Sequence, residues 1–165
     1  MSDILGRIQT FMKKTAKRPE AIHTWLLVLK ASQSIARYLL PPVLKAGLGD
    51  SDFRVLDVLL HKGPMPVNAI GPKVNLNPGS VSVAVNRLYK KGLVSRVESE
   101  SDRRVRTVSL TEEGRKVFVP LFRHHAALVE RAFQNVSPEE QRNVEDVLKR
   151  IGKRADRLAS ERKHR

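Results

Sequence analysis

The chain has 165 residues, of which 41% are hydrophobic and 29% are charged, and this composition is typical of a globular protein rather than a disordered one. Its formal charge of +14 favours a polyanionic partner, either nucleic acid or an anionic membrane surface. The absence of cysteine excludes disulfides, thiolate metal sites and a thiol redox sensor, and no apolar run approaches the ~20 residues of a membrane span. We therefore expect a cytoplasmic protein without a membrane segment.

Two helices are predicted before residue 49. Near the N-terminus, apolar residues recur at helical spacing with basic residues opposite them, at Ile4, Leu5, Ile8, Phe11 and Met12. This short helix is expected to pack on the protein body or on a partner subunit rather than on a membrane. A second helix begins at Pro19, and we expect Pro41 and Pro42 to end it because proline cannot continue the hydrogen-bond ladder. Its predicted buried stripe comprises Ile22, Trp25, Leu26, Leu29 and Ala36.

The central segment predicts a compact series of short helices. Asp50 or Ser51 is expected to cap a helix that Gly63-Pro64 ends. A brief strand at Met65 then leads into a helix over residues 66–74. The next helix has Asn77 as its N-cap and Pro78 at its first position, and Gly92 stops it.

The helix that begins at Pro78 has two contrasting faces. One face is apolar and is expected to be buried, with Val81, Ala84, Val85 and Leu88. The other carries hydroxyl, amide and basic groups and one apolar side chain, at Ser80, Ser82, Val83, Asn86, Arg87 and Lys90. These are the residue types that contact base edges and phosphates in a DNA groove, although a solvated helix face would look similar.

A basic hairpin follows this helix. Residues 93–97 and 105–110 alternate apolar and polar side chains as half-buried strands do, and a polar connection joins them. Arg96 lies on the incoming strand, and Asp102, Arg103, Arg104 and Arg106 lie at or just beyond the tip. An arginine here could enter a minor groove while an aspartate orients it, and the adjacent helix favours this over a salt-bridged surface turn.

Two long amphipathic helices complete the chain. They begin at Thr111-Glu112-Glu113 and at Ser137-Pro138, with acids in their first turns. The predicted apolar stripe of the last helix comprises Val144, Val147, Leu148, Ile151 and Leu158. Because the flanking helices have little core of their own, we expect them to pair with each other and with a second copy.

In three segments the chain resembles the MarR family of bacterial winged-helix regulators: DFRVLDVLLHKGP, NPGSVSVAVNRLYKKGLVSR and SDRRVRTVSLTEEGR. The resemblance is close over residues 49–116. It implies a mainly α fold with a small β-hairpin wing, in which residues 49–111 form the winged helix-turn-helix lobe and residues 1–48 and 112–165 form a helical dimerisation lobe. It also implies a homodimer that controls transcription, commonly by repression that a small ligand relieves.

The resemblance also assigns residues to a DNA-binding site. By position, the recognition helix supplies Pro78, Ser80, Ser82, Val83, Asn86, Arg87 and Lys90. The wing supplies Arg96, Asp102, Arg103, Arg104 and Arg106, with Arg103 or Arg104 in the minor groove and Asp102 as its orienting partner. Many members have threonine then arginine at Ser82 and Val83, and an acid at Asn86. Because this chain departs from the family pattern at these three positions, we expect its operator sequence to differ from the family's well-known sites.

A small-molecule pocket between the two lobes is a further implication of the resemblance. Candidate lining residues are Trp25, Gln33, Arg37, Tyr38, Phe53 and His61. Arg37 could receive an anionic or phenolic ligand, whereas Trp25 at helical spacing is more often part of an ordinary core than of a binding site.

Enzymatic and metal-binding functions find little support. No phosphate-binding glycine loop, nucleophile elbow or paired carboxylates occur, so neither an enzyme nor a cofactor is predicted. His23, His61 and either His124 or His125 could converge on zinc, but no cysteine or i, i+4 pair supports this, and polar groups at helix interfaces are favoured. The alternatives to a nucleoid-associated regulator are an architectural DNA binder without sequence preference, and a ligand-binding or interaction module without DNA readout.

Overall fold

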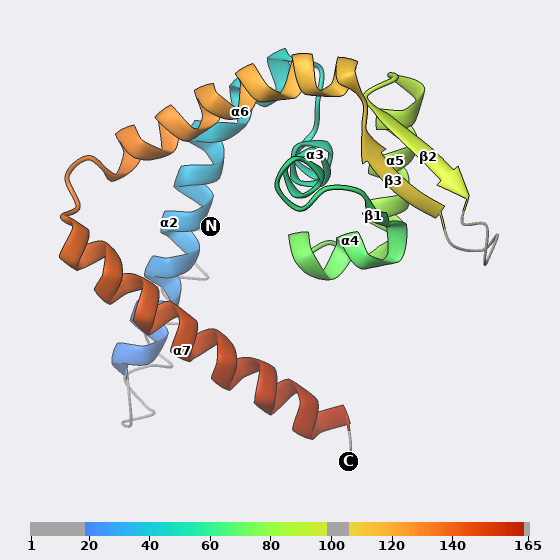
Figure 1. Cartoon of the computed structure of the whole chain (residues 1–165). Helices are drawn as coiled ribbons and strands as arrows, with labels where there is room; N and C mark the ends of the chain where they lie inside the picture. Colours follow the sequence, from blue (N-terminus) through green and yellow to red (C-terminus); the bar gives the residue numbers. More distant parts are fainter. Residues whose placement is uncertain (1–18, 99–105, 164–165) are drawn as a thin grey trace, which may run out of the picture. The chain divides into compact units, whose positions relative to one another are not determined.

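The structure is a computed structural model that describes residues 19–98 and 106–163. In chain order the elements are α2 (Pro19–Lys45), α3 (Asp50–Lys62), β1 (Met65–Pro66), α4 (Val67–Val74), α5 (Pro78–Lys90), β2 (Val94–Glu98), β3 (Arg106–Leu110), α6 (Glu112–Phe133) and α7 (Pro138–Lys163) (Figure 1). The chain forms two compact units, Met1–His125 and Ala126–Arg165. The mainly helical fold with a small sheet is as predicted. The N-terminal helix expected near Ile4 lies outside the described residues.

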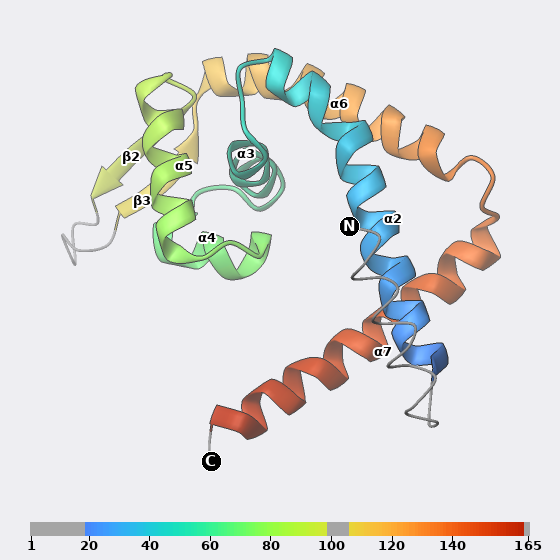
Figure 2. The same ribbon diagram turned by 180° about the vertical axis from the view of Figure 1, so that it is seen from behind.

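The first unit contains a winged helix. Helices α3, α4 and α5 pack together, and a three-stranded antiparallel sheet in the order β1-β3-β2 lies beside them (Figure 2). Met65 on β1 and Arg96 on β2 both pair with Val108 on β3. The buried core draws on all of these elements and on α6, with Val55, Leu56, Leu59, Ile70, Val81, Val85, Leu88, Val94, Val108 and Phe118. The core thus fixes α5 against the hairpin.

Helix α5 begins as predicted, whereas the start of α3 differs. The side chain of Asn77 accepts a hydrogen bond from the backbone N–H of Ser80 at 2.8 Å, and Pro78 occupies the first turn. At α3 the N-cap is Gly49, and neither Asp50 nor Ser51 caps the helix. The carboxylate of Asp52 instead accepts from the Gly49 N–H at 2.9 Å. This hydrogen bond satisfies the N–H of the N-cap residue from a side chain three positions later.

Helix α2 continues through the two prolines that were expected to end it. Pro41 and Pro42 lie inside the helix, which ends at Lys45 and is followed by Gly47 with a φ of 72°. The prolines lack the N–H groups that would reach back four residues, but the helix continues to Lys45, and just beyond it the Ala46 N–H donates to the carbonyl of Pro42 at 3.1 Å. The additional turn brings Val43 into the core, where it is 2% exposed.

The first turn of α6 is joined to the end of α5. The Thr111 hydroxyl donates to the carbonyl of Gly92 at 2.7 Å and accepts from the Gly114 N–H at 2.9 Å, which makes Thr111 the cap of α6. A Cβ on Gly114 would lie 2.0 Å from the carbonyl oxygen of Leu93. Glycine is therefore required there for the two backbones to approach closely.

Parts of the predicted buried stripes lie at the surface of the single chain. On α2, Ile22 and Trp25 are exposed. On α7, the whole apolar stripe is at least 41% exposed, comprising Val144, Val147, Leu148, Ile151 and Leu158. Within residues 19–98 and 106–163, these side chains lack the burial that was expected for them. Among the described helices, none is long and apolar enough to cross a membrane.

Candidate nucleic-acid interface

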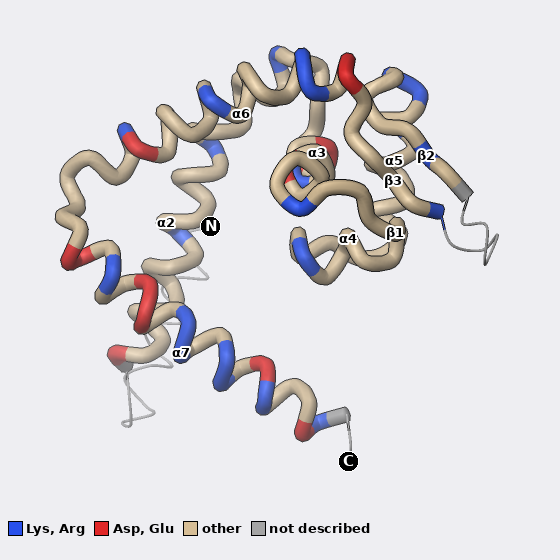
Figure 3. The backbone as a smooth tube through the Cα atoms, in the orientation of Figure 1, with Lys and Arg blue, Asp and Glu red and all other residues tan. Residues whose placement is uncertain are grey.

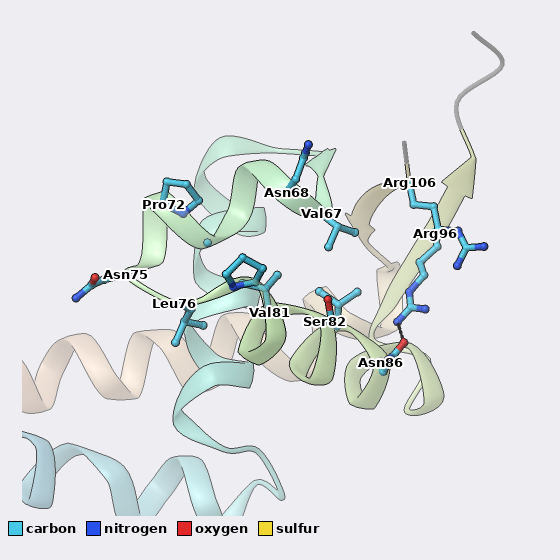
Figure 4. Close-up of a pocket in the computed structure, with 13 residues that line it drawn as sticks. Val67, Asn68, Pro72, Asn75, Leu76, Val81, Ser82, Asn86, Arg96 and Arg106 are labelled. Carbon is cyan, nitrogen blue, oxygen red and sulfur yellow. Dashed lines mark hydrogen bonds between the residues drawn. The ribbon is translucent and has the colours of Figure 1, made fainter. Parts of the chain in front are cut away.

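An open groove of about 770 Å³ runs along α5 between α4 and the hairpin (Figure 4). Its lining combines apolar side chains with amide, hydroxyl and basic groups from four elements and the α4–α5 turn. The lining residues are Val67, Asn68, Gly71, Pro72, Asn75, Leu76, Pro78, Val81, Ser82, Val85, Asn86, Arg96 and Arg106. The groove brings together five of the predicted DNA-binding residues: Pro78, Ser82, Asn86, Arg96 and Arg106.

The exposed face of α5 carries the other predicted recognition-helix residues. Val83 is 53% exposed, so its methyl groups lie in solvent on this face. Ser82, Arg87 and Lys90 are also exposed, whereas Ser80 is half-buried near the helix start. The face thus presents hydroxyl, amide, apolar and basic groups, the set that reads DNA bases and phosphates.

Arg87 is bound within the protein. Its Nε and Nη2 donate to the Asp52 carboxylate at 2.8–3.3 Å, and Nη2 also donates to the Ser51 hydroxyl at 3.0 Å. Asp52 is nearly buried, so the ion pair compensates a charge that has lost its water. This partner was missed in the sequence because 35 residues separate the two side chains.

Arg96 also contacts α5. Its Nη2 donates to Oδ1 of Asn86 at 2.5 Å, and its guanidinium lies 4.8 Å from the centre of the Tyr89 ring. Tyr89 was not predicted as part of the site. A cation over an aromatic face is held in place by the ring's negative π-surface.

The wing is described only in part. Arg106, the first residue of β3, lines the groove, whereas Asp102, Arg103 and Arg104 lie outside the described residues. Basic residues lie at the end of α5 and on both strands of the hairpin (Figure 3). A concentration of positive charge beside a groove attracts a polyanion.

The predicted ligand-binding residues separate into exposed and packed groups. Trp25, Gln33, Arg37 and Tyr38 are exposed on α2. Phe53 and His61 pack against aromatic side chains of α6. Phe53 meets Phe118 edge-to-face and His125 at a tilt, and His61 meets Phe122 edge-to-face.

His125 lies at the end of this aromatic cluster. Its Nδ1 is buried with no hydrogen-bond partner among the described residues. Burial lowers the pKa of His125; the carboxylate of Asp57 opposes this effect, and His124 reinforces it. The neutral imidazole is therefore the favoured form in the folded protein. Within residues 19–98 and 106–163, no three His, Asp or Glu side chains are grouped to hold a metal ion.

The element order, the three-stranded sheet and the exposed polar face of α5 define a winged helix-turn-helix protein. A model of the MarR family matches residues 48–105. The HTH-type transcriptional regulator MhqR of Bacillus subtilis is 33% identical over 133 residues, which cover 81% of this chain and 92% of that protein. The chain belongs to the MarR family of transcriptional regulators, and its relatives are regulators rather than enzymes.

Solved structures agree on the fold. A MarR-family regulator from Silicibacter pomeroyi superposes with a TM-score of 0.66 at 26% identity, over 76% of this chain and 84% of that one. Sco3205 from Streptomyces coelicolor, solved in complex with DNA, has a TM-score of 0.77 at 22% identity and covers 84% and 89% of the two chains.

Proposed function

We propose that this protein binds an inverted-repeat operator as a homodimer and represses nearby genes until a small anionic or phenolic ligand releases it. The observation that carries the proposal is the groove along α5, where Ser82, Asn86 and Arg106 line one continuous surface. The protein would act in the cytoplasm, on the nucleoid.

Bases and phosphates would contact different parts of this surface. Ser82, Val83 and Asn86 lie on the exposed side of α5, where they would meet base edges in the major groove. Ser80 and Pro78 at the helix start and Lys90 at its end would lie near phosphates. The wing residues Asp102, Arg103 and Arg104 would reach the flanking minor groove.

Dimerisation would cover the apolar stripe of α7. Five large apolar side chains at helical spacing remain exposed in the single chain, and monomeric proteins rarely leave such a continuous surface in water. A second copy supplies the same stripe by two-fold symmetry. Two recognition helices in one dimer would then lie about 34 Å apart and read half-sites roughly 10 base pairs apart.

The ligand would act from the α2 and α6 side of the winged helix. Phe53, His61 and His125 provide aromatic surface there, and Arg37 on α2 carries a charge suited to an anion. A titration of ligand candidates against the DNA complex, read as release of labelled operator, tests this part.

The wing is tested by Arg104→Ala. We expect severe loss of operator binding with an intact dimer, measured by gel shift and size-exclusion chromatography. Undiminished binding by the double variant Arg103→Ala/Arg104→Ala would remove the wing from the interface.

Specific regulation is distinguished from the alternatives by affinity ratios. At physiological salt, a regulator should bind its operator on the order of a thousand times more tightly than random DNA. Equal affinities would indicate an architectural DNA binder. Absence of any salt-dependent DNA binding would indicate a ligand or interaction module instead.

A further inference from the structure

Arg96 is turned toward the protein, although it lines the groove that we propose for DNA. Nη2 contacts Oδ1 of Asn86 at 2.5 Å, and Tyr89 supports the guanidinium from α5. Its Nε is buried and has no hydrogen-bond partner within the described residues. Figure 4 shows the side chain extending from the hairpin to Asn86 along the groove wall. Two contacts from one helix therefore hold Arg96 in place.

The contact with Arg96 determines how the Asn86 amide is oriented. An arginine side chain has only hydrogen-bond donors, so Asn86 must turn its oxygen toward it. The amide nitrogen, with its two hydrogens, then remains for the DNA. Asn86 is exposed on the face of α5 that would enter the major groove, so this nitrogen is accessible.

This orientation disfavours the usual way in which asparagine recognises adenine. That pairing needs the amide oxygen and nitrogen to face the same base, one accepting from N6 and the other donating to N7. With its oxygen directed toward the hairpin and one of the two lone pairs occupied by Arg96, Asn86 presents mainly its amide donors to the DNA. Donors match the adjacent O6 and N7 acceptors of guanine or the O4 acceptor of thymine, whereas adenine places its N6 donor beside its single N7 acceptor.

We propose that Arg96 is a positioning residue that fixes Asn86 as a hydrogen-bond donor, so that each half-site carries guanine or thymine, not adenine, at the position that Asn86 contacts. The proposal rests on the proposed function. It assigns Arg96 a role in sequence choice rather than in phosphate binding, and it makes Tyr89 the support of that role.

The test is selection of bound fragments from a randomised DNA library by the full-length protein and its variants. Asn86→Ala should abolish the preference at one position of each half-site. Arg96→Met frees the amide, so adenine should rise at that same position by at least about fivefold relative to guanine and thymine, with the other positions unchanged. The double variant should match Asn86→Ala alone.

Two conservative variants and one control sharpen the result. Arg96→Lys keeps a donor for the Asn86 oxygen and should retain the parent preference. Asn86→Asp still pairs with Arg96 but has no donor, so the preference should move toward the amino group of cytosine. Lys90→Met removes one positive charge from the same surface and should lower the affinity for all DNA sequences by the same factor.

The inference is wrong if Arg96→Met lowers the affinity for every DNA sequence by one common factor, as the Lys90→Met control is expected to do. It is also wrong if the parent already prefers adenine at the position that Asn86→Ala affects. A parent that selects no sequence at all would overturn the proposed function together with this inference, so the two failures are distinguishable. Circular dichroism confirms that each variant is folded.

Discussion

Arg87→Met should destabilise the fold more than the loss of an ordinary surface charge. The Asp52 side chain is 3% exposed and that of Arg87 is 45% exposed, so the carboxylate is buried and the guanidinium is partly solvated. Methionine retains much of the aliphatic stem but has no donor. In the variant, the buried carboxylate keeps its hydrogen bond from the Gly49 N–H and loses its counter-charge.

The magnitude follows from these exposures. Exposed ion pairs contribute about 0.2–1 kcal/mol, and removal of one partner from a buried pair costs about 3–5 kcal/mol. With only one partner buried, we expect Arg87→Met to lower the free energy of unfolding by about 2 kcal/mol. Asp52→Asn retains an oxygen for Gly49 and should cost about 1 kcal/mol. The double variant should cost less than the sum, because no buried charge then lacks a partner.

Urea denaturation followed by circular dichroism measures all four proteins at one fixed concentration, since the stability of a dimer depends on concentration. Arg87→Lys serves as the charge-preserving control and should fall between the parent and Arg87→Met. The reasoning is refuted if Arg87→Met lies within about 0.5 kcal/mol of the parent while the salt dependence of DNA binding falls by about one unit of slope. Arg87 would then be a phosphate contact.

Three further results are expected. Gly114→Ala should lower the free energy of unfolding by more than about 3 kcal/mol, because its Cβ would meet a backbone carbonyl at 2.0 Å. Gly152→Ala, whose Cβ would lie in open space, should raise the free energy of unfolding by about 0.5–1 kcal/mol. Thermal and urea unfolding compare the two variants. Ile151→Glu should shift the protein toward the monomer in light scattering, while Ser160→Glu, with the same added charge on another face of α7, should not. Burial lowers the pKa of His125 in the folded state, so the unfolded state binds more protons and the free energy of unfolding should fall as the pH drops below about 6.5. His125→Gln should make the free energy of unfolding, measured by urea denaturation from pH 5 to 7.5, less dependent on pH.

The sequence predicted the elements whose signals are local. Asn77 and Pro78 define the start of α5 because a cap and a first-turn proline act within four residues. The fold class followed from such signals and from the family motifs. The prediction that Pro41 and Pro42 end α2 was wrong because it used a local rule alone. Proline does remove a helical hydrogen bond, but burial of Val43 beyond the prolines favours one more turn.

Site contacts that join distant residues could not be predicted in this way. Nothing in the residues near Arg87 indicates that its partner is Asp52, and the hydrogen bond from Arg96 to Asn86 depends on how the hairpin folds back on α5. The exposure of Trp25 and of the apolar stripe on α7 could not be predicted for a different reason. Amphipathic spacing shows that a face will be buried, but it does not say whether the covering surface belongs to the same chain.

The junction at Thr111 has a consequence for how a signal could travel through the molecule. Its hydrogen bonds end on main-chain atoms of Gly92 and Gly114, and the carbonyl of Leu93 lies against Gly114 without an intervening side chain. A tilt of the first turn of α6 would therefore be passed directly to the end of α5, because no side chain separates the Leu93 carbonyl from Gly114. Under the proposed function, such a tilt would change the angle at which α5 meets the DNA.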